Sequence, residues 1–230
     1  MEFPADLIPG RFVERPNRFL TVVDCGRRRV QAHLPNTGRL REILVPGRTV
    51  YLTPAHNPNR KTRFSLILAD LDHGLVCLDS GVPPIVAAQH FSSGDFIAFA
   101  NYDTVRREVG RFGSRYDLVL TGRELPELII EVKGVTLVRG GRALFPDAPT
   151  ERGRRQIEGL IEARKKGLRT AVVFMIMRSD ANLFQPNTEG DPLFSHGLKR
   201  AREMGVEVYA LSCHVTTRGV RMDRPIEVVL

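Results

Sequence analysis

Apolar residues in the first third of the chain occur in short runs separated by turn residues. The runs are rich in Val, Ile, Leu and Phe, and the segments between them carry Pro, Gly, Asn and Asp, which favour turns. Short strands at this spacing are typical of a small barrel. The predicted strands are residues 11–16, 18–24, 27–34, 48–54, 64–71 and 75–80.

One segment between the third and fourth predicted strands has a different period. Leu40, Ile43 and Leu44 recur at helical spacing, and the pattern stops at Pro46. The sequence therefore predicts a short helix over residues 39–47. A five-stranded barrel with a helix in this position has the layout of an OB-fold. A plain β-meander is the alternative that the pattern leaves open.

The hydrophobic period changes near residue 82, where Pro83 and Pro84 indicate a linker and the start of a helix. We predict a domain boundary at this point. An OB-like β-barrel is expected in residues 1–81 and a mixed-sheet α/β domain in residues 82–230.

The second domain is predicted to contain three strands followed by an alternation of helices and strands. The first two strands are expected to form a hairpin joined at residues 110–114. Thr150 is a candidate N-cap for the first long helix and Gly167 its terminator. Strand–helix–strand units of this kind pair in parallel. The predicted strands are residues 103–109, 115–121, 128–138, 170–177 and 206–215, and the predicted helices are residues 150–167 and 191–205.

The strand over residues 128–138 is apolar except for Glu131 and Lys133. Side chains alternate along a strand, so these two share one face. If the preceding strand pairs with this one, Asp117 joins them on that face. Two carboxylates so placed repel each other unless a cation lies between them, and Mg²⁺ or Mn²⁺ suits such oxygen ligands. We predict a metal site with Asp117 and Glu131 as ligands and Lys133 as a catalytic partner, an arrangement suited to phosphodiester chemistry.

Other interpretations of these residues stay open. Glu131 and Lys133 also fit an ordinary ion pair at the end of a sheet. Glu108, on the other arm of the predicted hairpin, is a candidate third carboxylate. Alternation along the strand over residues 115–121 places Tyr116 on the face opposite Asp117.

The helix over residues 150–167 has a polar side that carries Arg152, Arg155 and Gln156. That side either faces the same cleft or faces only water, and a solvated face is the commoner case. If it faces the cleft, Gln156 contributes to the catalytic group and the two arginines bind nucleic acid.

A formal net charge of +8 and a pI of about 9.9 point to a polyanionic partner. Clusters of arginine and lysine predict contacts with the nucleic-acid backbone, without sequence preference. Phe19, Tyr51 and Phe64 are candidates for stacking on bases, and the chain has no Trp, so duplex and single-strand binding are both compatible with it. The clusters that we predict to bind nucleic acid are Arg27, Arg28 and Arg29, then Arg39 and Arg41, then Arg60, Lys61 and Arg63.

Several classes of protein are disfavoured by the sequence. The start of the chain lacks a signal-peptide pattern, and the longest apolar run is too short to span a bilayer, so a cytoplasmic protein with no membrane partner is expected. Three dispersed cysteines suggest neither a disulfide framework nor a zinc site. No Walker-type phosphate loop is present, and no organic cofactor is expected. A homodimer is an open alternative to a monomer.

The segments "AHLPNTGRL", "GSRYDLVL", "IIEVKGVTL" and "FPDAPTERGRRQIEGL", in this order, resemble the sugar fermentation stimulation protein family of bacteria and archaea. The resemblance covers nearly the whole chain. It implies an OB-like domain followed by a domain similar to PD-(D/E)xK nucleases. It also implies a DNA-binding protein without sequence specificity that has a regulatory role in sugar metabolism.

The nuclease-like signature that the resemblance implies falls on Asp117, Glu131 and Lys133, with Gln156 as a helix contribution. Tyr116 stands where the name of the motif has Pro. The alternative function is therefore a nuclease dependent on Mg²⁺ or Mn²⁺ that cleaves DNA or RNA. A fold does not by itself establish an activity, so DNA binding is the first expectation and cleavage the second.

Overall fold

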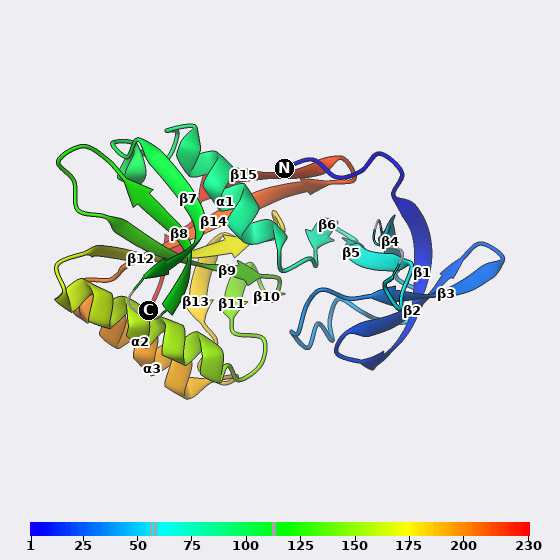
Figure 1. The fold of residues 1–230 in the computed structure, drawn as a ribbon. Coiled ribbons are helices and arrows are strands. Elements are labelled where there is room, and N and C mark those ends of the chain that lie inside the picture. The colour runs from blue at the N-terminus through cyan, green and yellow to red at the C-terminus, as the bar shows by residue number, and fades with distance from the viewer. Residues whose placement is uncertain (56, 58, 112–113) are drawn as a thin grey trace.

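The computed structural model describes residues 1–55, 57, 59–111 and 114–230. An N-terminal barrel is followed by a mixed-sheet α/β domain (Figure 1). All six strands predicted in the first part of the chain are confirmed. They are β1 (Ile8–Asn17), β2 (Leu20–Cys25), β3 (Arg28–His33), β4 (Thr49–Pro54), β5 (Phe64–Leu71) and β6 (Gly74–Cys77).

The barrel closes because its two end strands meet. The strand order is β3-β2-β1-β4-β5, and β3 also pairs in parallel with β5, while β6 extends the sheet beyond β5. Alternate positions of the strands, including Val23, Leu52 and Leu66, are fully buried inside. The predicted OB-like barrel is confirmed.

Residues 39–47 do not form the predicted helix. Leu40 has a positive φ of 52°, and its N–H donates to Oδ2 of Asp147 at 2.8 Å. A single turn follows, in which the N–H of Leu44 donates to the carbonyl of Leu40 at 2.8 Å. The apolar residues of the segment fill the barrel core as their spacing suggested, but the stretch is too short to sustain a helix.

The α/β domain contains three helices of more than one turn among the described residues. Its helical segments are α1 (Val82–Ser92), the 3₁₀ turn η1 (Ile97–Phe99), α2 (Glu151–Lys165) and α3 (Pro192–Glu203). Its strands are β7 (Thr104–Arg111), β8 (Ser114–Thr121), β9 (Leu128–Val135), β10 (Val138–Arg139), β11 (Arg142–Phe145), β12 (Arg169–Ile176), β13 (Leu183–Pro186), β14 (Glu207–Thr216), β15 (Gly219–Pro225) and β16 (Glu227–Val228).

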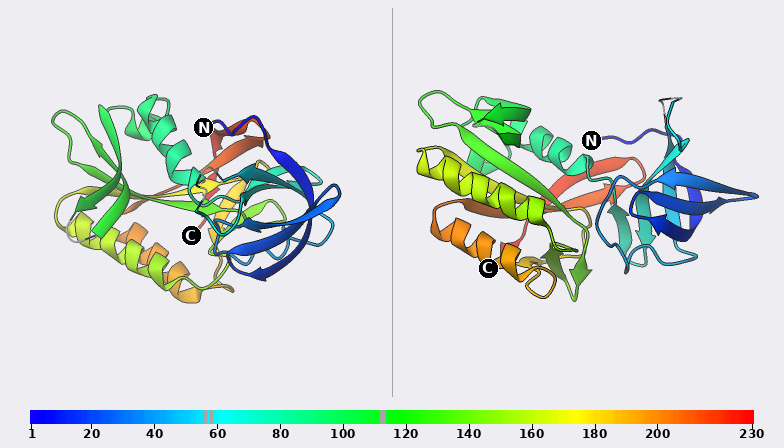
Figure 2. Two further views of the ribbon diagram at one scale, coloured as in Figure 1. Left: turned by 45° about the vertical axis from the view of Figure 1, so that its right-hand side comes forward. Right: turned by 60° about the horizontal axis from the view of Figure 1, so that its bottom comes forward.

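The main sheet has the order β15-β14-β12-β9-β8-β7. Strands β9, β12 and β14 run parallel, as the strand–helix–strand pattern predicted, and the other neighbours run antiparallel. Helix α1 packs against one face, and helices α2 and α3 pack against the other (Figures 1 and 2). The apolar side chains of β9 divide between the two cores, with Ile130 in the first and Ile129 in the second. The predicted mixed sheet is confirmed.

The helix ends follow the predicted chemistry. Helix α1 begins at Val82 with Pro83 and Pro84 in its first turn. The Thr150 hydroxyl accepts a hydrogen bond from the N–H of Gly153 at 3.0 Å and so caps α2. Gly167 has the positive φ, 86°, of a helix terminator. The domain boundary near residue 82 stays a prediction.

The sequence did not predict the small sheet β10-β11-β13-β16 or the strand β15. Strands β10 and β16 have two residues each and β11 and β13 have four, which is too short for a period to show. In the predicted β7–β8 turn, residues 112–113 lie outside the described residues. Over the described ranges, no helix is long and apolar enough to cross a membrane.

Candidate active site in the cleft between barrel and sheet

A cleft of about 580 Å³ lies where the barrel meets the α/β domain. The barrel contributes Arg18 and residues 36–38, and the α/β domain contributes the end of β9, the loop over residues 146–150 and the first turns of α2. Asp117, Glu131 and Lys133 all line this cleft. The residues predicted to form a catalytic group are therefore brought together.

The floor of the cleft is a buried, hydrogen-bonded group of polar side chains. The Lys133 ammonium donates to Oε1 of Glu131 at 2.7 Å and to Oε1 of Gln156 at 2.6 Å. Oδ2 of Asp117 accepts a hydrogen bond from the N–H of Val132 at 2.8 Å. Strands β8 and β9 and helix α2 thus each place at least one side chain at this point, and Glu131 is only 2% exposed.

The charge of Glu131 is disfavoured in the fold. Burial raises the pKa of Glu131 to about 7, and the nearby Asp117 carboxylate raises it too, although Lys133 opposes both effects. A carboxyl group that is partly protonated at neutral pH gains from any further positive charge beside it. A further positive charge beside Glu131 would therefore favour its ionised form.

The donor set fits a hard divalent ion that keeps part of its water shell. In the described part of the chain, no group of three or more His, Cys, Asp or Glu side chains is placed to hold a metal. Asp117 and Glu131 are the carboxylates beside Lys133, whereas Asp79 and Asp147, which also line the cleft, accept hydrogen bonds from the N–H groups of Gly81 and Leu40. Mg²⁺ is commonly bound through one or two carboxylates with several waters retained. The buried Glu131 and its raised pKa are the features that favour such an ion.

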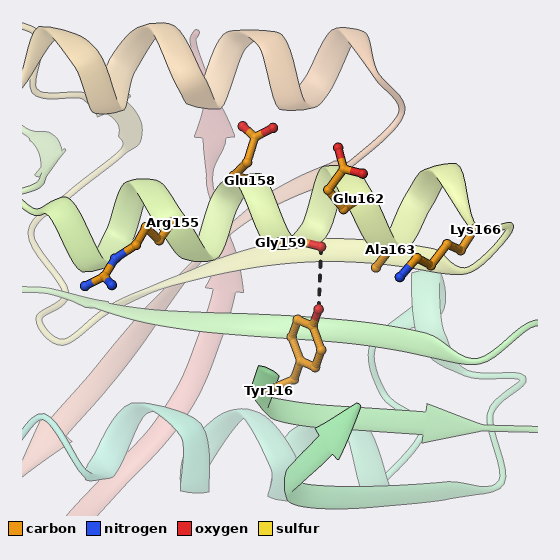
Figure 3. A pocket seen from close by; sticks show the side chains of 7 residues that line it. All are labelled: Tyr116, Arg155, Glu158, Gly159, Glu162, Ala163 and Lys166. Carbon is orange, nitrogen blue, oxygen red and sulfur yellow. Dashed lines mark hydrogen bonds between the residues drawn. The ribbon is translucent and has the colours of Figure 1, made fainter. Parts of the chain in front are cut away.

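The polar residues of helix α2 line two different surfaces. Arg152 and Gln156, one turn apart, line the cleft, so the cleft-facing alternative holds for them. Arg155 instead lines a separate groove beside Tyr116 (Figure 3), and its guanidinium lies 3.9 Å from Glu151.

Tyr116 departs from the predicted alternation. Its hydroxyl donates to the carbonyl of Gly159 on α2 at 3.5 Å (Figure 3), so it lies on the α2 side of the sheet, the face that the alternation assigned to Asp117. The pairing of β8 with β9 extends only to Leu118 and Ile130, whereas its pairing with β7 continues in the same register to Ser114. Glu108 is exposed, paired with Arg115 and outside the described lining of the cleft, so it does not act as a third carboxylate there.

The predicted basic clusters of the barrel lie on separate loops. Arg27, Arg28 and Arg29 are exposed on the β2–β3 hairpin, which projects away from the α/β domain (Figure 1). Arg39 and Arg41 are exposed in the β3–β4 connection, and Arg60, Lys61 and Arg63 lie between β4 and β5. Among the described residues that line the cleft, only Arg152 comes from the basic residues predicted to bind nucleic acid.

Sequence reasoning missed the barrel loop that forms one wall of the cleft. The half-buried Arg15 guanidinium fixes this loop by donating to backbone carbonyls. The acceptors are Gly38 at 2.7 Å, Arg18 at 2.8 Å, Arg39 at 2.9 Å and Asn36 at 3.0 Å.

Two further residues of the cleft were not predicted. Arg18 lines it from the barrel, and Asp147 lines it from the α/β domain while accepting a hydrogen bond from the N–H of Leu40. The signal was present in the sequence, because the PNTG and FPDAPT segments, which carried the family resemblance, are the segments that meet here.

The fold and the cleft define a protein that joins an OB-like barrel to a mixed-sheet α/β domain through a polar, partly buried site. Residues 13–78 match the family model described as the SfsA N-terminal OB domain. Residues 81–219 match the model described as the sugar fermentation stimulation protein RE domain. The chain belongs to the sugar fermentation stimulation protein family, as the resemblance indicated.

Relatives of known name agree with this membership. A sugar fermentation stimulation protein homolog of Desulforamulus reducens is 44% identical over 98% of this chain and 93% of the relative. The homolog of Moorella thermoacetica is 41% identical over the full length of both. The solved structure of Pyrococcus furiosus SfsA in complex with Ca²⁺ is 30% identical, covers 100% of this chain and 98% of that chain, and superposes with a TM-score of 0.92.

Proposed function

We propose that this protein is a divalent-metal-dependent nuclease that hydrolyses phosphodiester bonds of DNA or RNA in the cleft. The observation that carries the proposal is the convergence of Asp117 and Glu131 beside the buried Lys133. The same geometry favours the second of the two functions predicted from the sequence over binding alone, because binding does not require a buried carboxyl group with a raised pKa.

Asp117 and Glu131 would hold the metal. A bound Mg²⁺ or Mn²⁺ supplies a polarised water and positive charge next to the phosphate. The solved relative is described as a complex with Ca²⁺, which is likewise a hard divalent ion that takes oxygen ligands.

Lys133 and Gln156 complete the group. The Lys133 ammonium is held between Glu131 and Gln156, so it is oriented before any substrate arrives. In that position it orients the attacking water or neutralises charge that develops on the phosphate oxygens. Gln156 is a positioning residue, because it acts through Lys133.

The test uses purified protein, end-labelled DNA and RNA, and Mg²⁺ or Mn²⁺. We expect the wild-type protein to cleave at least one of single-stranded DNA, duplex DNA, branched DNA or RNA, and EDTA to stop it. Asp117→Asn should remove the cleavage. Asp6→Asn, at an exposed position of the barrel segment, is the matched control and should leave it intact.

Two outcomes would contradict the proposal. Cleavage that persists in Asp117→Asn would come from a contaminant or another site. No cleavage of any substrate with either metal would remove the nuclease assignment and leave nucleic-acid binding as the function.

Binding of DNA without sequence specificity is the second candidate. It is supported by the net charge of +8 and by exposed basic residues on several barrel loops. The affinity should fall steeply between low and moderate salt, because neutralised phosphates release counterions. Equal affinity at low and moderate salt, measured by fluorescence anisotropy, would exclude this electrostatic mechanism.

Two predictions from the sequence extend this proposal, a cytoplasmic location and a regulatory role in sugar metabolism. A homodimer stays an open alternative to a monomer. Light scattering of the purified protein tests the dimer directly. A monomer at the concentrations used for binding would exclude a role for the dimer in nucleic-acid binding.

A further inference from the structure

We infer that the cleft takes an unpaired nucleic-acid strand, with a base stacked on the Arg18–Phe19 pair of the barrel and its phosphates held between Arg18 and Arg152. This inference rests on the proposed function and names the substrate class of the same site. It assigns a specificity role to the β1–β2 turn.

The walls of the cleft are tied together at two points. The N–H of Leu40, in the barrel, donates to Oδ2 of Asp147 at 2.8 Å. The N–H of Cys77, at the end of the barrel, donates to the carbonyl of Met177 at 3.0 Å. Asp147, Cys77 and Met177 all line the cleft, so its width cannot increase unless these bonds break.

The reactive group lies deep inside this restricted space. The Glu131 side chain is 3% exposed and that of Lys133 is 10% exposed. The cleft volume of about 580 Å³ is of the size that encloses a single small ligand. A single extended strand can bring a phosphate to this floor. A duplex is wider and stiffer, so the two walls would keep its phosphates at a distance from the floor.

The β1–β2 turn offers a stacking surface beside the cleft. Phe19 is 46% exposed, although large aromatic side chains usually contribute to a core. The Arg18 guanidinium lies 5.0 Å from the centre of the Phe19 ring, and the His33 ring is stacked at 6.4 Å with an interplanar angle of 17°. Aromatic rings and guanidinium planes are the surfaces on which unpaired bases stack.

The turn is held in place before any ligand binds. The N–H of Phe19 donates to Oδ1 of Asn17 at 2.9 Å, and the carbonyl of Phe19 accepts from the N–H of Leu34 at 2.9 Å. Arg15 also fixes the carbonyl of Arg18 at 2.8 Å. An ordered exposed aromatic loses little conformational entropy when a base stacks on it, which favours a binding role.

The charges that face the cleft divide between a floor and its sides. Asp117 and Glu131 lie on the floor beside Lys133. On the sides, Arg18 lines the cleft from the barrel and Arg152 from α2, and the carboxylates of Asp79 and Asp147 line it as well. A strand whose scissile phosphate lies on the floor therefore has one basic side chain in each domain available for its neighbouring phosphates.

The test compares a labelled single strand with a blunt duplex of the same length, by fluorescence anisotropy in EDTA and again in Ca²⁺. We expect the wild-type protein to bind the single strand at least about tenfold more tightly. Phe19→Ala should weaken single-strand binding about tenfold, the scale of one stacked base, and leave duplex binding unchanged. Ile97→Ala, at a 91% exposed apolar position of the α/β domain, is the matched control.

A second variant gives a direct optical signal. The chain contains no Trp, so the indole that Phe19→Trp introduces is its only one. Single-stranded DNA should quench this indole and bind with near wild-type affinity, while duplex DNA should leave the emission unchanged.

The outcomes separate this inference from the proposed function. Equal losses for single strand and duplex in Phe19→Ala, or an indole that neither strand type quenches, would overturn the inference while cleavage still stands. Preferential binding and cleavage of duplex would overturn it as well. If the wild-type protein binds no nucleic acid under any salt condition, both this inference and the proposed function are contradicted.

Discussion

The cleft floor and the basic loops of the barrel carry charge in opposite ways. On the floor, Glu131 and Lys133 are buried and contact each other, and Gln156 on another element contacts the same ammonium. On the barrel, Arg27 and Arg60 belong to different loops and lie at or near the surface. One arrangement concentrates charge at a point, and the other distributes it over a surface.

This difference sets what each region can do. A buried charged group is preorganised in a medium of low dielectric constant, so each member has a large effect on charge that develops next to it. Exposed cations are screened by salt, and each adds a small increment to affinity. Single substitutions should therefore have large effects on the floor and small ones on the barrel loops.

The largest effect is expected for Lys133→Met, which keeps the aliphatic bulk and removes the charge. The cleavage rate should fall about a hundred- to a thousandfold, the usual cost of removing one electrostatic contact to a transition state. Single-turnover cleavage assays measure it. Lys165→Met, at an exposed lysine of α2 that pairs with Glu162, should change the rate less than twofold. Equal effects of the two substitutions would show that Lys133 is only one cation among many.

Asp191→Ala, beside the wall of the cleft, should have an intermediate effect, and the quantity it lowers is the stability of the fold. Asp191 is 2% exposed and accepts hydrogen bonds from the N–H of Thr150 at 2.8 Å, the N–H of Phe194 at 3.0 Å and the guanidinium of Arg154 at 2.9 Å. The substitution removes the α3 cap and frees the loop over residues 146–150.

We expect the free energy of unfolding in urea to fall by about 2–3 kcal/mol. Glu189→Ala, an exposed neighbour, should change it by less than about 0.5 kcal/mol. A decrease in Asp191→Ala no larger than that of the control would mean that the wall does not depend on this carboxylate.

Metal affinity at the floor should rise with pH. Burial raises the pKa of Glu131 to about 7, so this carboxyl group is mainly protonated at pH 6 and mainly ionised at pH 8. A metal ligand must lose its proton to bind, so the affinity for Mn²⁺ should increase about tenfold over this interval. Isothermal titration calorimetry measures this change in affinity. In Glu131→Gln the affinity for Mn²⁺ should no longer depend on pH. A constant affinity from pH 6 to pH 8 would contradict the assignment of Glu131 as a ligand.

The same contrast explains which parts of the molecule the sequence could predict. Strand β9 is a nearly continuous buried strand, and because successive side chains of a strand point to opposite faces, the shared face of Glu131 and Lys133 followed from their spacing in the sequence. The N-cap of α2 was also predictable, because Thr150 acts on a residue three positions away. Local periodicity and local hydrogen bonds leave direct signs in the sequence.

Interactions between distant segments leave no such sign. The bond between Leu40 and Asp147 joins residues 107 positions apart, and it accompanies the positive φ of Leu40 where a helix was predicted. Tyr116 lies on the α2 side, beyond the point where β8 stops pairing with β9, and strict alternation cannot foresee this change of side. The composition of the cleft wall depends on these long-range interactions and required the structure.

The smallest effect is expected on the β2–β3 hairpin, where Arg27→Ala combined with Arg28→Ala should weaken duplex binding only a few-fold. Arg29 is left in place because its guanidinium pairs with Asp24 at 2.7 Å. The slope of log affinity against log salt should become shallower by about 0.9 for each phosphate that the variant no longer neutralises. Binding titrations between about 50 and 200 mM salt measure this slope.

The matched control for that pair is on an exposed hairpin of the α/β domain. Arg218→Ala combined with Arg221→Ala removes two exposed arginines from the β14–β15 hairpin of the α/β domain. If affinity is distributed over the barrel loops, the barrel pair should change the salt slope and the control pair should not. Equal changes in the salt slope would mean that exposed arginines of both domains contribute to binding. The barrel loops would then have no special role in affinity.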